Sequence, residues 1–256
     1  MDQSKKSTVD LVGGARVTHR IKVLQLQLRF NVNISDLAEQ IIQGLPADRF
    51  EVTTVFLSGR PGPRDTESCA PRSIYFDFKK DELKGLKRFR ALWHLYKHCR
   101  DERYDIVIAH RFKPMNMLML LNSRLKLPVC IGVQHGIGDF DRFLRRLEAR
   151  FLIKPNWKTV GVSRAVCDYL ISCRAGFRQD NTVQINNAID IERAERVQHS
   201  RENARAELGL NSDAFILGCI GRLVPIKGHI FLIEAFSRIQ KDYPEVQVAI
   251  ILSLIH

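Results

Sequence analysis

Short apolar runs alternate with amphipathic stretches along most of this 256-residue chain. The apolar runs have the length and alternation of strands, and the stretches between them repeat apolar positions at helical spacing. Strands are predicted at 21–28, 51–57, 74–78, 105–109, 128–133, 159–162, 183–185, 214–219 and 246–252. Helices are predicted at 35–44, 83–99, 115–125, 140–151, 164–172 and 201–208, and after Gly228. This order predicts an α/β fold with a doubly wound parallel sheet.

A change in polarity predicts how the chain divides into domains. Residues 1–18 are expected to form a flexible tail, and 19–192 a first Rossmann-like domain. The very polar stretch 193–204 predicts a hinge, because linkers between domains are exposed and polar. Residues 205–256 then form a partial second Rossmann-like domain, which is too small to bury much apolar surface alone.

The predicted helix at 83–99 combines apolar and basic positions. Leu86, Phe89, Leu92, Trp93 and Tyr96 recur at helical spacing, so we expect them to form its apolar face. The cations are expected to lie around the rest of the helix. Two interpretations of this basic patch remain open: a solvated surface, or contact with anionic lipid or a phosphorylated acceptor.

The net charge is unusual, whereas the hydrophobic fraction of 45% is ordinary for a globular protein. A formal charge of +12 and a sequence pI near 9.7 attract polyanions such as nucleic acid, anionic lipid or phosphorylated substrates. The basic patches lack an interleaved aromatic platform, and no DNA-binding motif is present. We therefore expect no nucleic-acid partner.

Cysteine usage and targeting signals bear on location. The six cysteines form no Cys-x-x-Cys pair and no zinc-like set with histidine, which favours reduced thiols. No apolar run reaches the length of a membrane span, and residues 1–10 lack the apolar core of a signal peptide. We expect a cytoplasmic protein, either free or peripheral at the inner face of the cytoplasmic membrane.

The loop after the strand at 214–219 carries two cations, Arg222 and Lys227, between Gly221 and Gly228. In open parallel sheets, ligands bind beyond the carboxyl ends of the strands. Fixed cations there suit a phosphate or diphosphate, although solvation of a surface loop explains them equally well.

His135 occupies the corresponding place after the strand at 128–133, directly before Gly136. A histidine there can donate a hydrogen bond or transfer a proton near neutral pH, or it can be satisfied within its own loop. His110 ends the preceding strand and is a weaker candidate. No Walker loop, nucleophile elbow, paired catalytic acids or metal-ligand spacing is present in the sequence.

Four stretches, together with their order along the chain, resemble glycosyltransferase family 4, the group 1 transferases of GT-B architecture. The most specific is Gly221-Arg222-Leu223 with Lys227-Gly228, followed by a helix containing Glu-Ala-Phe at 234–236. The weaker matches are Gln134-His135-Gly136, Val162-Ser163 and the Asn-Asn-Ala-Ile-Asp turn at 186–190. Together the matches lie in a region from about residue 21 to 252.

The resemblance implies roles for these positions. Arg222 and Lys227 would contact the donor's diphosphate and neutralise the departing nucleoside diphosphate, so no metal and no cofactor are expected. His135 would line the sugar pocket. The further pocket-lining residues that it implies are Gly136, Ser163, Asn187, Gly221 and Gly228.

The chain also departs from the family pattern. The loop at 29–33 reads Arg-Phe-Asn-Val-Asn where the family has Gly-Gly, and Ala188 replaces a usual glycine. Members of the family continue after the second strand of the donor domain with a Gly-x-Gly loop, further βα units and a pair of glutamates. Because the sequence ends at His256, we expect a C-terminally truncated donor domain.

The sequence therefore predicts a retaining glycosyltransferase that uses a nucleotide-sugar donor. The acceptor would be a saccharide or lipid-linked saccharide, such as lipopolysaccharide core, bound by residues 19–192, and transfer would be impaired by the truncation. Two alternatives remain: a non-catalytic remnant that binds only the acceptor, and a GT-B-fold sugar-nucleotide epimerase.

Overall fold

The computed structural model describes residues 20–32, 37–63 and 65–252, and these form two compact units. The first unit is Met1–Asp190 and the second is Ile191–His256. The predicted tail at 1–18 and the first two residues of the helix predicted at 35–44 lie outside the described residues.

A seven-stranded parallel sheet with the order β3-β2-β1-β4-β5-β6-β7 forms the centre of the first unit. The order reverses between β1 and β4, which is the switch point of a doubly wound sheet. Its strands are β1 (Ile21–Arg29), β2 (Phe50–Ser58), β3 (Arg72–Tyr75), β4 (Ile106–His110), β5 (Val129–Gln134), β6 (Trp157–Gly161) and β7 (Thr182–Gln184). The predicted fold class is confirmed.

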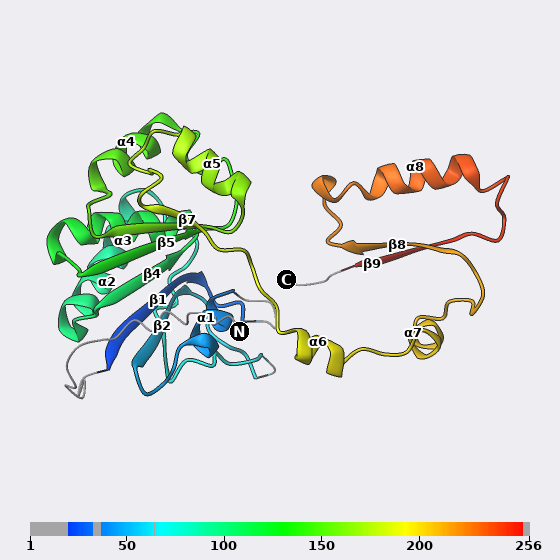
Figure 1. The fold of residues 1–256 in the computed structure, drawn as a ribbon, viewed down its shortest axis with the longest axis horizontal. Coiled ribbons are helices and arrows are strands. Elements are labelled where there is room, and N and C mark those ends of the chain that lie inside the picture. The colour runs from blue at the N-terminus through cyan, green and yellow to red at the C-terminus, as the bar shows by residue number, and fades with distance from the viewer. Residues whose placement is uncertain (1–19, 33–36, 64, 253–256) are drawn as a thin grey trace, which may run out of the picture. The chain divides into compact units, whose positions relative to one another are not determined.

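Helices cover both faces of this sheet (Figure 1). On one face α1 (Leu37–Gly44) packs Ile42 against Val23 and Ile108. The opposite face carries the short 3-10 turn η1 (Gly85–Lys87) and the helices α2 (Arg88–Glu102), α3 (Phe112–Leu125), α4 (Phe143–Leu152) and α5 (Arg164–Ser172). Because right-handed crossovers run in both directions from β1, the two sets of helices lie on opposite faces.

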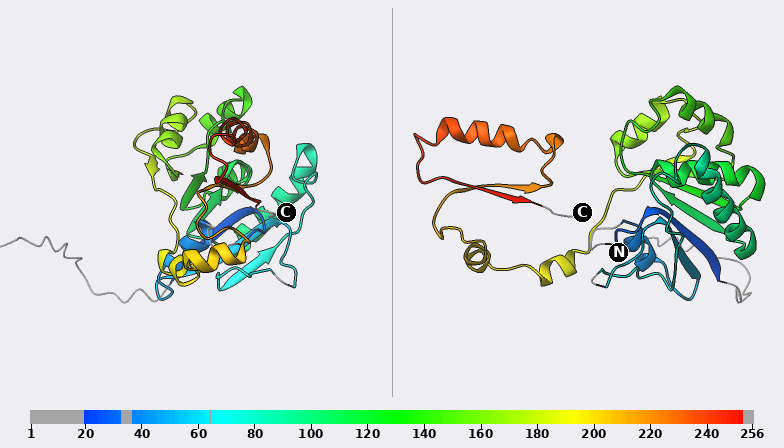
Figure 2. Two further views of the ribbon diagram at one scale, coloured as in Figure 1. Left: turned by 90° about the vertical axis from the view of Figure 1, so that its right-hand side faces the viewer. Right: turned by 180° about the vertical axis from the view of Figure 1, so that it is seen from behind.

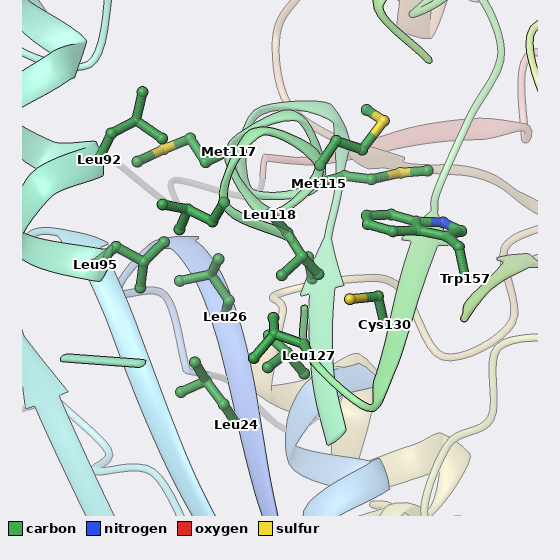
Figure 3. Packing of buried hydrophobic residues seen from close by; sticks show 14 of the residues in the cluster. Leu24, Leu26, Leu92, Leu95, Met115, Met117, Leu118, Leu127, Cys130 and Trp157 are labelled. Atoms are coloured by element: carbon green, nitrogen blue, oxygen red, sulfur yellow. The ribbon is translucent and has the colours of Figure 1, made fainter. Parts of the chain in front are cut away.

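The larger core lies between the sheet and α2 to α5. Figure 3 shows Leu24 and Leu26 of β1 extending toward Leu95 of α2, while Met115 of α3 lies beside the ring of Trp157. A methyl group on Gly132 of β5 would lie 2.7 Å from the Cε atom of Met115. The glycine therefore lets Met115 pack directly onto the strand.

The orientation of α2 differs from the prediction. Its buried residues are Ala91, Leu92, Leu95 and Cys99. The side chains of Leu86, Phe89 and Trp93, predicted to face inward, are 83%, 58% and 60% exposed. Both sets recur at helical spacing, and the set that contains the small Ala91 and Cys99 allows closer packing on the sheet.

Smaller differences concern element boundaries in the first unit. The third strand lies at Arg72–Tyr75 rather than 74–78, because it pairs with β2 from Thr53 onward. The helix predicted from Phe140 begins at Phe143, because the Phe140 side chain is fully buried against Phe112 and Phe177.

The second unit contains α6 (Ile191–Arg196), α7 (Arg201–Glu207), the parallel pair β8 (Ile216–Gly221) and β9 (Gln247–Leu252), the 3-10 turn η2 (Pro225–Lys227) and α8 (His229–Ile239) (Figure 2). Helices α6 and α7 occupy much of the stretch predicted as a hinge. The boundary between the two compact units lies after Asp190, two residues before the predicted end of the first domain. Phe231 of α8 is 70% exposed, because two strands offer little surface to cover the helix.

Candidate functional site

The carboxyl ends of β4 and β5 bring two histidines together in the first unit. His110 is the last residue of β4 and is 5% exposed, and His135 directly follows β5. Residues paired across these strands are His110 and Val133, so the two histidine side chains project from the same edge of the sheet. Their ring centroids are 5.7 Å apart.

A chain of hydrogen bonds fixes the protonation of both rings. His110 Nε2–H donates to Gln25 Oε1 at 2.7 Å. Since an amide oxygen only accepts, the Nδ1 of neutral His110 is an acceptor, and His135 Nε2–H donates to it at 3.4 Å. His135 Nδ1 is therefore left as the acceptor atom of that ring.

Burial keeps both rings neutral at physiological pH. Desolvation, together with the charges of His135 and Arg111, lowers the pKa of His110 from 6.5 to about 3. Desolvation and Arg111 lower the pKa of His135 from 6.5 to about 4. The pair can accept or donate hydrogen bonds at pH 7, but it does not supply a positive charge.

These depressed pKa values predict acid lability of the first unit. Between pH 6.5 and about 4 the unfolded chain binds protons at these histidines that the folded chain does not bind. The free energy of unfolding should fall by about 1.4 kcal/mol per pH unit for each histidine as pH decreases through that window. Urea titrations should show a shallower pH dependence for His110→Asn than for wild type. An unchanged slope in His110→Asn, or an equal flattening by the exposed-residue control His94→Asn, would contradict the assignment.

The loop after β5 is held by Gln134. Its Nε2 donates to Gly136 O at 3.2 Å and to Asp139 Oδ2. Among the described residues, apart from its two neighbours in the chain, no atom lies within 4 Å of a methyl group built on Gly136. Packing within the protein thus does not require the glycine at 136, and the space beside it is open.

Sequence reasoning missed Gln25 and Arg111 at this edge. Gln25 was visible as a polar residue inside an apolar strand, and its side chain is fully buried. Arg111 has φ 68° and ψ 170°, a conformation that L residues rarely adopt, as it leads from β4 into α3. Such strain costs on the order of 1–3 kcal/mol and tends to occur at functional sites.

Two other predicted residues follow β6 and β7, the strands beyond β5 in the sheet. Val162 N donates to Gln134 O at 3.2 Å, so Ser163 lies at the same edge of the sheet as His135. Ser163 Oγ accepts from Val166 N at 3.3 Å, which makes it the N-cap of α5. Asn187 is exposed in the segment after β7. The Ser163 hydroxyl therefore has a local structural role at the start of α5.

In the second unit, the loop between β8 and α8 presents Arg222 and Lys227 with exposed side chains. The η2 turn ends at Lys227 and is capped by Gly228, whose φ of 68° suits glycine. The aliphatic part of Lys227 lies 3.5 Å from a methyl group built on Gly221, so the lysine stem packs over the end of β8. Both predicted glycines therefore shape the loop that carries the cations.

His229, which showed no signal in the sequence, anchors this loop. It is 5% exposed, and its Nε2–H donates to Arg222 O at 2.9 Å. Its Nδ1 lies 3.3 Å from Cys219 Sγ of β8. The backbone of Arg222 also accepts from Val224 N at 2.8 Å. The histidine thus ties the first cation of the loop to the start of α8.

Residues 20–32, 37–63 and 65–252 contain no group of three or more His, Cys, Asp or Glu side chains that could hold a metal ion. No helix within these ranges is long and apolar enough to cross a membrane.

Comparison with known proteins identifies the class. The family model described as Glycosyltransferase Family 4 matches residues 35–193, and the chain belongs to this family. The recognition and the GT-B fold class expected from the sequence are thereby confirmed.

Individual relatives are more distant. An Escherichia coli UDP-Gal:alpha-D-GlcNAc-diphosphoundecaprenol alpha-1,3-galactosyltransferase is 23% identical over 232 residues, which cover 85% of this chain and 58% of that protein. The chain thus spans a little over half of the length of this curated relative.

Solved structures share the fold. Anabaena Alr3699/HepE in complex with UDP and glucose is 18% identical with a TM-score of 0.66, covering 90% of this chain and 61% of that one. Neisseria meningitidis UDP-GlcNAc 2-epimerase bound to UDP-GlcNAc is 13% identical with a TM-score of 0.60, covering 92% and 67%.

Proposed function

We propose that this chain is the acceptor-side domain and part of the donor-side domain of a retaining glycosyltransferase. The enzyme moves a sugar from a nucleotide-sugar donor to a saccharide or lipid-linked saccharide acceptor. Membership of Glycosyltransferase Family 4 supports the reaction class.

The loop at Arg222 and Lys227 is the observation that carries the proposal. Two exposed cations project from one short loop whose backbone is fixed by η2 and by His229. Such a preorganised pair stabilises the negative charge that develops on a departing nucleoside diphosphate. It supplies the charge that a divalent metal provides in other transferases, so we expect transfer without a metal.

His135 and Gly136 are proposed to line the sugar pocket of the first unit. A neutral histidine with a defined tautomer offers one acceptor, Nδ1, to a sugar hydroxyl. The open space beside Gly136 admits a ligand close to the backbone.

The acceptor is proposed to be lipid-linked. The basic first unit favours a phosphorylated glycolipid, of which lipopolysaccharide core is one example. The Escherichia coli relative is named for a diphosphoundecaprenol-linked acceptor, which supports this class of molecule.

A nucleotide-sugar screen tests the proposal on this chain and on a version extended at its C-terminus. Thermal shift should detect a nucleoside diphosphate or nucleotide sugar, and incubation with a lipid-linked saccharide should give glycosylated acceptor in equal amount to released nucleoside diphosphate. Acceptor binding with no nucleotide binding in either version would instead establish the acceptor-binding remnant.

An epimerase remains a second candidate, because the solved UDP-GlcNAc 2-epimerases share this fold. Epimerisation changes the donor alone, whereas transfer consumes the donor only together with an acceptor. Conversion of a nucleotide sugar to its 2-epimer without acceptor would therefore replace the transferase proposal.

A further inference from the structure

Helices α2 and α4 carry apolar side chains on two faces. Their inner faces pack against the core through residues such as Leu95 and Ala149. Their outer faces, together with the η1 turn directly before α2, expose six further apolar side chains, which we call the α2–α4 surface: Leu86, Phe89, Trp93, Phe143, Leu144 and Phe151. Each of the six is between 58% and 83% exposed, whereas the outer face of an ordinary surface helix is polar.

The two helices belong to one layer. Both pack against α3, and Figure 1 shows the three helices on the same side of the sheet. Asn116 of α3 joins them: its Oδ1 accepts from Arg88 Nη1 at 3.3 Å, and its Nδ2 donates to Glu148 Oε2 at 2.8 Å. Arg88 of α2 and Glu148 of α4 therefore meet at the same residue of α3.

Cations accompany the apolar side chains on both helices. On α4, Arg146 and Arg150 follow Phe143 and Leu147 by three residues and lie beside the apolar stripe. On α2, Arg90 and Lys97 occupy the equivalent border next to Trp93. The segment from 79 to 103 contains nine Lys and Arg against four Asp and Glu. The border of the surface is thus strongly positive.

We propose that the α2–α4 surface docks on a membrane that contains anionic lipid. Aromatic and aliphatic side chains bordered by Lys and Arg are the pattern of helices that lie in the interface plane of a bilayer. The cations reach the headgroups while the apolar side chains enter the acyl boundary.

The aromatic pair on α2 suits the headgroup level. The rings of Trp93 and Tyr96 are stacked with centroids 5.7 Å apart, and Arg100 lies 5.9 Å from the centroid of the Tyr96 ring. Trp and Tyr are enriched at membrane–water interfaces because one end of each ring is apolar and the other is polar. Docking would bring the first unit to the layer in which the proposed lipid-linked acceptor resides.

Tryptophan fluorescence tests the surface directly, since the chain has two tryptophans and Trp157 is fully buried. Mixed phosphatidylcholine and phosphatidylglycerol vesicles should shift Trp93 emission to shorter wavelength, and brominated lipid should quench it. Trp93→Phe should abolish both signals while co-sedimentation persists. Pure phosphatidylcholine and high salt should weaken binding.

Surface variants extend the test. Phe143→Ser with Phe151→Ser should lower vesicle partitioning roughly tenfold or more for each side chain removed. Arg146→Glu with Arg150→Glu should lower it by roughly thirtyfold or more, since each cation near an anionic surface contributes about a fivefold factor. The matched control Val197→Ser, at an apolar position of the second unit that is 63% exposed, should bind as wild type.

Three results would overturn the inference. These are binding without any change in Trp93 emission, binding that the serine and glutamate variants leave intact, and a concentration-dependent dimer that the serine variants abolish in a chain that binds no vesicles. Circular dichroism confirms that each variant is folded. Vesicle binding requires neither the nucleotide-sugar donor nor glycosyl transfer. A negative result in the vesicle experiments can therefore be distinguished from a negative result in the transfer assay.

Discussion

Replacing Arg222 or Lys227 by alanine should abolish most glycosyl transfer. Each cation is expected to stabilise charge on the departing diphosphate, and loss of one such preorganised group lowers kcat by roughly 10²–10³-fold. Binding of a nucleoside diphosphate should weaken by roughly tenfold or more, because a hydrogen bond to a charged group contributes about 1.5–3 kcal/mol. Calorimetric titration with UDP and a transfer assay on the extended chain measure the two effects.

The matched control for this prediction is Arg238→Ala, which removes an arginine from the last turn of α8 and should behave as wild type. Arg222→Lys should recover part of the binding, since lysine retains charge but not the bidentate geometry of arginine. His229→Ala should weaken UDP binding without removing a cation, because it releases the carbonyl of Arg222. Equal UDP affinity in wild type and the double Arg222→Ala, Lys227→Ala variant would remove the diphosphate assignment.

Replacing His135 by alanine should lower transfer by roughly a hundredfold, the scale on which a positioned histidine contributes to catalysis. Because the pKa values of His135 and His110 are about 4 and 3, neither should produce an inflection in the rate between pH 5 and 8. The pH–rate profile of kcat/KM on the extended chain measures this.

His110 and Gln25 are expected to act through His135 as positioning residues. His110→Phe removes the acceptor for His135 Nε2–H, frees the tautomer of His135 and should lower transfer roughly tenfold. The Phe ring is apolar and would be as buried as the imidazole it replaces, so His135 should stay neutral. The pH–rate profile of this variant should therefore remain flat. A His135→Ala enzyme with wild-type kcat/KM would exclude the histidine from the sugar pocket, whatever the His110 variant does.

The arrangement of the first unit was readable from its sequence because its strands are continuous apolar runs separated by helices. A parallel sheet buries such strands on both faces, and strand ends then place His110 and His135 at one edge without further information. The loop with Arg222 and Lys227 was readable for the same reason.

The contact between Gln25 and His110 could not be read in this way. The residues are 85 positions apart, and their meeting depends on the register of β1 against β4, in which Gln25 pairs with Ile108. Hydrophobic pattern specifies which face of a strand is buried, but neighbouring registers that differ by two residues bury the same face.

The predicted orientation of α2 was wrong for a different reason. Phe89 and Trp93 have the spacing of a buried face, and so do Leu92 and Leu95. Both sets are apolar, so periodicity alone offers two solutions, and close packing on the sheet selects between them. His229 was missed because a histidine at a helix start has no distinguishing pattern, although its ring holds the loop of Arg222.

Because Met115 packs closely on Gly132, the residue type at one of these positions limits the residue type at the other. A methyl group at 132 would meet the methionine sulfur at 2.9 Å, so an alanine there would force the buried Met115 side chain to shift. Gly132 lies on β5 three residues before His135, which directly follows the strand, so an uncompensated substitution would displace that histidine without touching any ligand. Among homologous proteins the two positions should therefore vary together, and loss of transfer in Gly132→Ala should be recovered by Met115→Ala.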